Sequence, residues 1–157
     1  MVGAVGVSGA ASAQQDDEIA QAAADAFGAA TPVASVQYRA APLVRDAFAQ
    51  GTTLVESSDF RVNASRRDGP GEAEVHLRDT DVFYVLEGRA EIVTGGTLAG
   101  ARTDGDGELR APAIDGGMPR ELAPGDVLTI PRGVPHRFTR VDAPFVYYVV
   151  KTTSPEG

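Results

Sequence analysis

The only two histidines of the chain, His76 and His136, each lie near carboxylates in segments with the sequence pattern of β-strands. Side chains two residues apart on a strand share a face, so Glu74 and His76 point the same way. Asp81 follows a short turn and opens the next strand, from which it can return to the same point. His136 opens its own strand after a rigid turn with two prolines. These spacings allow all four side chains to meet.

Two carboxylates and two imidazoles inside a protein are costly unless their charges are neutralised. A divalent cation would neutralise both acids at once. Mixed nitrogen and oxygen ligands suit Fe, Mn, Co, Ni, Cu or Zn and do not select among them. We therefore predict one divalent metal ion held by Glu74, His76, Asp81 and His136.

A purely structural interpretation remains open. Each histidine would then be a hydrogen-bonded residue of the core or rim, and Asp79 competes with Asp81 as the acid of the first segment. The acids would pair with arginines at the surface, such as Arg78, Arg137 or Arg140.

The elements that must position these residues are short strands rich in Val, Ile, Phe, Tyr and Thr, separated by Gly, Pro and Asp. Many short strands at this spacing predict an all-β sandwich or barrel. Residues 95–119, the longest Gly-rich stretch, are expected to carry a mobile loop. The predicted strands are Thr53–Val55, Phe60–Ser65, Glu72–Leu77, Val82–Leu86, Ala90–Thr94, Leu109–Ala113, Arg120–Leu122, Val127–Ile130, His136–Arg140 and Phe145–Lys151.

One or two short helices should precede the strands. Residues 41–50 have Pro42 in their first turn and Gly51 as a stop, whereas residues 16–27 have an almost all-Ala apolar face and suit a short helix or a linker. Residues 1–13 end in Ala-Ser-Ala before a polar segment, as the remnant of a signal peptide does. We expect a remnant at 1–13, a linker or short helix at 14–35 and one domain at 36–157. The protein would then be secreted or periplasmic, the alternative being cytoplasmic.

Composition narrows the classes of function. The net charge of −8 argues against a general nucleic-acid binder, which needs clustered Lys and Arg. The chain has no cysteine, which excludes disulfides, thiolate ligands and a Cys nucleophile. No apolar run approaches the roughly 20 residues of a membrane span.

Aromatic residues on the predicted strands fall on two faces. Tyr84 and Tyr147 alternate to the outer face and would serve a dimer contact. The residues expected to line the pocket are Phe83, Val85, Phe138 and Tyr148.

The two segments resemble the two motifs of the cupin superfamily. In the second motif, Gly125, Pro131, Gly133 and His136 match in full, and Arg140 replaces the family's Asn. The resemblance covers about residues 55–151 and is closest to small single-domain cupins of the type-2 kind.

The first motif is altered. Glu74 stands at the position of the first His, His76 at the second His and Asp81 at the Glu, while Gly88 closes the motif and Gly69 lies one position from the expected opening glycine. Glu in place of His adds negative charge, which favours harder cations. Asp in place of Glu shortens the reach by one methylene.

The resemblance implies a cupin β-barrel, also called a double-stranded β-helix or jelly roll, often a homodimer, with one metal at those four positions. An enzyme is one hypothesis: a mononuclear metal cupin with oxygenase, isomerase or lyase chemistry on a small molecule. The alternatives are a non-catalytic metal or small-ligand binding module and a structural barrel without a working site, because cupins host all of these. The sequence does not choose the metal, the substrate or the reaction, and it leaves open whether the protein is an enzyme.

Overall fold

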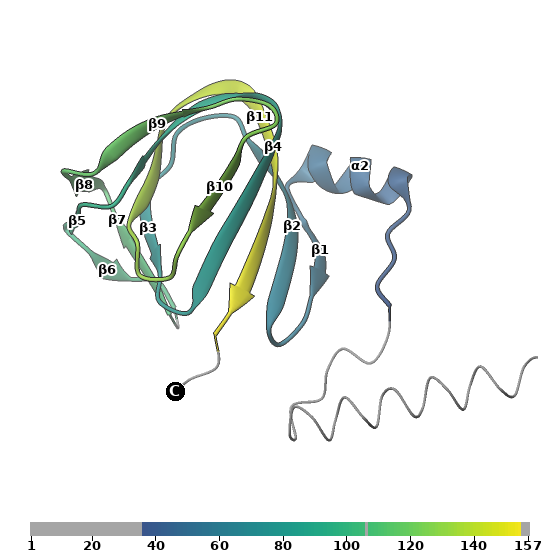
Figure 1. Ribbon diagram of the computed structural model, residues 1–157, viewed down its shortest axis with the longest axis horizontal. Helices are drawn as coiled ribbons and strands as arrows, with labels where there is room; N and C mark the ends of the chain where they lie inside the picture. The colour runs from purple at the N-terminus through teal and green to yellow at the C-terminus, as the bar shows by residue number, and fades with distance from the viewer. Residues whose placement is uncertain (1–35, 106, 155–157) are drawn as a thin grey trace, which may run out of the picture. The chain divides into compact units, whose positions relative to one another are not determined.

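Two long antiparallel strands form the centre of the fold in the computed structural model, which describes residues 36–105 and 107–154 (Figure 1). Strand β4 (Asp79–Thr94) and strand β11 (His136–Thr153) pair from Asp79 opposite Thr153 to Thr94 opposite His136. The sequence predicts four strands in these two stretches. They are continuous because the chain bends at Gly88 without leaving the ladder: Gly88 has φ +80°, and a Cβ there would clash with the carbonyl oxygen of Pro144.

The other strands extend this pair in both directions, and every strand pairing is antiparallel. The main ladder runs in the order β1 (Thr53–Glu56), β2 (Phe60–Arg67), β11, β3 (Ala73–His76), β7 (Glu108–Ala111) and β6 (Arg102–Thr103). Strands β9 (Met118–Leu122) and β10 (Val127–Ile130) pair with β4, and β5 (Thr97–Ala99) pairs separately with β8 (Ala113–Asp115). The predicted all-β class is confirmed.

Four short strands, β5 to β8, lie in the Gly-rich segment 95–119, in which the sequence predicts a mobile loop and one strand at Leu109–Ala113. Strand β7 overlaps that predicted strand, whereas β5, β6 and β8 escape prediction because they are two or three residues long and lie between Gly turns. At Gly96 and Gly117 the backbone has positive φ and passes close to neighbouring backbone atoms, so a side chain would not fit. These glycines therefore mark tight turns.

Helix α2 (Ala41–Gln50) packs on the outer face of β1 and β2, and it is the helix predicted at 41–50. Pro42 lies in its first turn, and Gly51 ends it with φ 68° and a hydrogen bond from its N–H to the carbonyl of Ala47. Phe48 meets Tyr148 edge to face at 4.7 Å between ring centroids. No helix within residues 36–105 and 107–154 is long and apolar enough to cross a membrane. The predicted signal remnant, and the helix or linker before residue 36, lie outside the described residues.

Helix α2 explains why the prediction that Tyr147 faces outward and Tyr148 lines the pocket was wrong. Strand β11 is apolar on both faces, because its outer face packs under α2 and its inner face lines the core and a cavity. Alternation alone therefore does not fix which face is which. Tyr147 points into the cavity and is 4% exposed, whereas Tyr148 packs against the helix.

The main core lies between β4, β9, β10 and β11. Its aromatic members are Phe83, Phe138, Phe145 and Tyr147. The rings of Phe138 and Phe145 lie 5.6 Å apart and those of Phe83 and Phe138 lie 6.2 Å apart. This aromatic packing fixes β4 against β11, and the same two strands carry polar residues of the cavity at one end.

Candidate metal centre

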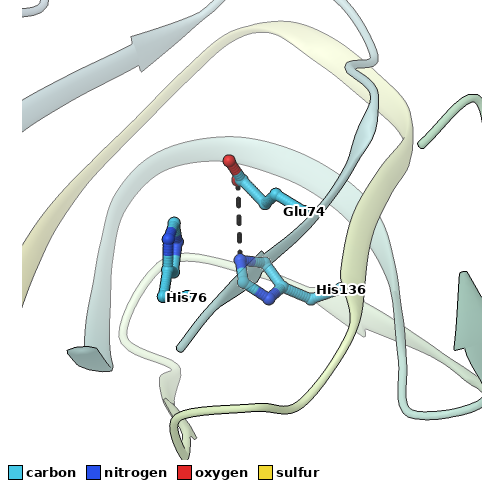
Figure 2. A group of neighbouring side chains, drawn as sticks. All are labelled: Glu74, His76 and His136. Carbon is cyan, nitrogen blue, oxygen red and sulfur yellow. Dashed lines mark ion pairs between the residues drawn. The ribbon is translucent and has the colours of Figure 1, made fainter. Parts of the chain in front are cut away.

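Strand β3 presents Glu74 and His76 to the same side, as the sequence predicts, and His136 at the start of β11 pairs in register with Glu74. One ligand atom from each of the three residues lies within 4.8 Å of the other two. Figure 2 shows the carboxylate of Glu74 facing the ring of His136, whose Nε2 lies 3.5 Å from Oε1. Both histidines are buried. Distant parts of the chain therefore meet at one point.

His136 presents an unused nitrogen to this point. The carbonyl of Val134, 3.1 Å from Nδ1, can only accept a hydrogen bond, so Nδ1 carries the hydrogen and Nε2 keeps its lone pair in the neutral ring. Nε2 is fully buried and has no hydrogen-bond partner among the described residues. A buried imidazole nitrogen without a partner is unusual unless it binds something.

His76 is oriented by a carboxylate outside the predicted set. The two oxygens of Glu108, which stands opposite His76 in the β3–β7 register, lie 2.6 and 2.8 Å from Nδ1. This contact turns Nε2 toward the centre of the site. Burial and Lys151 lower the pKa of His76, but the hydrogen bond with Asp81 and the charges of Asp81 and Glu108 outweigh them and raise it.

Asp81 lies beside His76 but is engaged by Lys151. The Lys151 Nζ lies 2.7 Å from both carboxylate oxygens of Asp81 and 2.8 Å from Nε2 of His76. Asp81 and Lys151 are register partners on β4 and β11. Burial favours the neutral acid, yet the hydrogen bond with His76 and the ammonium of Lys151 lower the pKa of Asp81.

Glu74 is engaged in a similar way by Arg110, its register partner on β7, whose Nη1 donates to the carboxylate. The Nη2 of Arg67 lies 3.7 Å from the same group. Burial opposes ionisation, but the ring of His136, which can donate to this carboxylate and add positive charge when it is protonated, and the charge of Arg110 lower the pKa of Glu74 to about 2.

Positive charge to balance the two acids, which we expected from a metal ion, is thus also supplied by the protein itself. Lys151 and Arg110 pair with the two acids. The arginines considered from sequence bind elsewhere in two cases: Arg137 donates to the carbonyl of Gly71, and Arg140 pairs with Glu121.

Sequence reasoning missed Lys151, Glu108 and Arg110. The signal for Lys151 was its rarity, because it is the only lysine among 14 basic residues. Glu108 and Arg110 could have been noticed as a pair, because they lie two residues apart and therefore share a face of one short strand. That they face His76 and Glu74 follows only from the pairing of β3 with β7, which the sequence does not show.

A cavity of 230 Å³ opens beside these residues, lined from β2, β3, β4, β7 and β11. Strand β2 contributes alternate residues, among them Arg61 and Arg67. The Nε of Arg67 donates to the hydroxyl of Tyr147 at 3.0 Å. The Nε of Arg61 is buried without a hydrogen-bond partner among the described residues. The cavity therefore combines the acids Glu74, Asp81 and Glu108 and the ring of His76 with the guanidinium groups of three arginines, two of which lie on β2.

The residues present fit a divalent metal ion. Two imidazole nitrogens and one carboxylate converge, and the lone pair of His136 Nε2 is unused. His76 is fixed by an outer carboxylate, which is the usual support for a metal-bound histidine.

The comparisons with known proteins agree with this architecture. The model of the Cupin family matches residues 49–157. No curated protein matches the chain significantly.

Among solved structures, BH2720 from Bacillus halodurans is 15% identical with a TM-score of 0.53, and the match covers 78% of this chain and 85% of that protein. KdgF from a Halomonas species is 17% identical with a TM-score of 0.48, covering 66% of this chain and 79% of that one. A protein with a double-stranded β-helix domain from Klebsiella pneumoniae is 20% identical with a TM-score of 0.48, covering 68% and 78% respectively. At these identities the likeness to solved structures concerns the fold alone.

Proposed function

The chain belongs to the cupin family, and from that premise we propose that it is a metal-dependent enzyme acting on a small anionic molecule. The observation that carries the proposal is the buried Nε2 of His136, which has no hydrogen-bond partner among the described residues and lies in a group of ligand atoms with Glu74, 3.5 Å away, and His76. Buried polar atoms without partners are rare in folded proteins, so this nitrogen is best explained by a ligand that the pocket takes up.

Glu74, His76 and His136 would hold the metal ion. When bound, such an ion acts as a Lewis acid toward an oxygen of the substrate. The chain's own part is to fix the donors. Glu108 holds Nδ1 of His76 and Val134 holds Nδ1 of His136, so both Nε2 atoms face the same point.

The guanidinium groups of the cavity indicate the class of substrate. Arg61 and Arg67 line the wall formed by β2, and Arg61 has a buried N–H without a partner. Arginine is well suited to a carboxylate or phosphate, because its planar fork can donate two parallel hydrogen bonds. A small acid would therefore be oriented by this wall.

Tyr147 supplies a hydrogen-bond donor to the same cavity. Burial raises the pKa of its hydroxyl, so the group keeps its proton at neutral pH. Arg67 fixes the position of the same oxygen by donating to it. Tyr147 is therefore a neutral donor within reach of a molecule in the cavity.

Metal content tests the proposal directly. Protein purified without a metal-affinity tag would be loaded separately with Fe, Mn, Co, Ni, Cu and Zn and desalted, in parallel with the double variant His76→Ala, His136→Ala. We expect about one equivalent of at least one metal in the wild type and none in the variant. Equal retention by both folded proteins, checked by circular dichroism, would reject the metal site.

A second function, a binding module without turnover, is favoured by a different observation. Lys151 and Arg110 already pair with the acids, so the pocket is charge-compensated as a metal-free receptor for a small anion. Calorimetry with small mono- and dicarboxylates on chelator-treated protein separates the two. Tight binding without metal, and no turnover of any bound acid with metal, would favour the receptor.

A further inference from the structure

Lys151 occupies a position that a metal ion would need. Its Nζ lies 2.8 Å from Nε2 of His76, and Nδ1 of the same ring is already held by Glu108. A metal bound through His76 would therefore use Nε2. The lone pair of that nitrogen cannot serve the ammonium and a metal together.

The same ammonium also holds the remaining acid. Both oxygens of Asp81 lie 2.7 Å from Nζ, and the side chain of Lys151 is 12% exposed. A divalent ion placed next to this ammonium meets a like charge on a largely buried side chain, where the repulsion is stronger than in water. The pocket thus already contains a positively charged group, the ammonium of Lys151.

We infer that Lys151 is a resident cation which a metal ion must displace, so that this one side chain sets how tightly the site binds metal. The inference rests on the proposed metal site of Glu74, His76 and His136. Its first consequence is that removal of the ammonium strengthens metal binding. Its second is that Asp81, once released, becomes an additional ligand.

Arg61 provides the matched control. It stands opposite Lys151 in the β2–β11 register, lines the same cavity and carries the same charge. Its ion pairs are with Glu56 at 3.5 Å and Asp79 at 3.7 Å, outside the group of metal donors. Arg61→Met therefore removes a positive charge from the cavity without freeing a donor.

The experiment measures the dissociation constants of Zn²⁺ and Mn²⁺ by chelator competition for the wild type, Lys151→Met and Arg61→Met. We expect at least about tenfold tighter binding in Lys151→Met, equivalent to about 1.4 kcal/mol, and a change within about threefold in Arg61→Met. Unchanged or weaker binding in Lys151→Met, or an equal gain in both variants, would overturn the inference while leaving the metal site standing. Absence of binding in all three proteins would overturn the proposed metal site and the inference with it.

The double variant Lys151→Met, Asp81→Asn isolates the second consequence. If Asp81 is recruited as a ligand, the double variant should lose most of the gain shown by Lys151→Met. A gain that survives in full would show that Asp81 is not recruited.

A measurement on the wild type covers the case in which Lys151→Met does not fold. Because Lys151 is the only lysine, protein labelled with ¹³C at lysine Cε gives a single lysine signal. We expect this signal to move on addition of Zn²⁺ and to stop moving at one equivalent. A signal that stays in place while calorimetry shows Zn²⁺ binding would overturn the displacement of Lys151.

Discussion

Glu74 and Arg110 face each other across strands β3 and β7, and the guanidinium of Arg110 donates to the carboxylate of Glu74. The pair lies at the inner edge of the cavity, where the Glu74 side chain is 13% exposed. Together with the ring of His136, which has the larger effect, Arg110 lowers the pKa of Glu74 and so makes stability depend on pH.

Metal-free protein should lose stability as the pH falls from about 4.5 toward 2, because the pKa of Glu74 lies at about 2 in the folded state against an ordinary value of 4.5. Between these values the unfolded chain binds the proton and the folded one does not. The contribution is therefore complete above the unfolded pKa and is lost as the pH falls through the folded one. At about 1.4 kcal/mol for each pKa unit, it amounts to at most about 3.5 kcal/mol.

Urea unfolding at pH 6 and pH 3 measures this effect. Glu74→Gln should reduce the difference in unfolding free energy between the two pH values. Glu121→Gln is the control, because Glu121 forms an exposed pair with Arg140, and such pairs contribute little. An identical pH difference in wild type and Glu74→Gln would show that Glu74 does not carry it.

Glu108→Ala should weaken metal binding about tenfold to a hundredfold, as the loss of a carboxylate behind a metal-bound histidine usually does. The reason is that Glu108 holds Nδ1 of His76 at 2.6 Å and directs Nε2 toward the site. Glu108→Gln, which still accepts a hydrogen bond, should lose less. Chelator competition with Zn²⁺ gives both values, and equal affinity in all three proteins would contradict the role of Glu108.

Glu74→His should raise the preference for Zn²⁺ over Mn²⁺. Imidazole suits the softer ion, and the loss of a negative charge weakens the hold on Mn²⁺. The new ring would start from a backbone position that already faces His136, with which Glu74 is in register. The ratio of the two dissociation constants is the readout. A ratio equal to that of the wild type would mean that Glu74 is not a metal ligand.

The homodimer expected from sequence stays a prediction, and the structure suggests where it would form. Tyr84 and Val127 are neighbours in the β4–β10 register and are 45% and 65% exposed. Two apolar side chains side by side on an open sheet face are candidates for burial against a second copy. Light scattering should give twice the chain mass for the wild type and one chain mass for Val127→Asp. A single-chain mass for the wild type would contradict the prediction.

The sequence was a good guide to the fold and to the first members of the site. Alternation placed Glu74 and His76 on one face, and the Pro and Gly pattern before His136 placed that residue at the start of a strand. Both inferences use distances of a few residues, over which backbone geometry alone decides where a side chain points.

What sequence did not supply were the partners across strands. Lys151 lies 70 residues from Asp81, and Glu108 lies 32 residues from His76. Such pairs depend on strand order and register, which local periodicity does not contain. The sequence also predicted Tyr147 on the outer face of β11 and Tyr148 on the inner face, the reverse of their positions in the structure. Packing against α2 makes both faces of the strand apolar, so the two could not be told apart.

The Lys151–Asp81 pair also bears on how β11 finds its place during folding. Residues 145–150 are all apolar or aromatic, so alternation of polar and apolar residues does not specify the register of this stretch against β4. A slip of one residue would place Val150 or Thr152 beside Asp81 and leave a buried carboxylate without its ammonium. We therefore expect the pair to penalise misaligned strands. Replacing both residues by leucine should remove that penalty, which doubled backbone resonances of β11 would reveal.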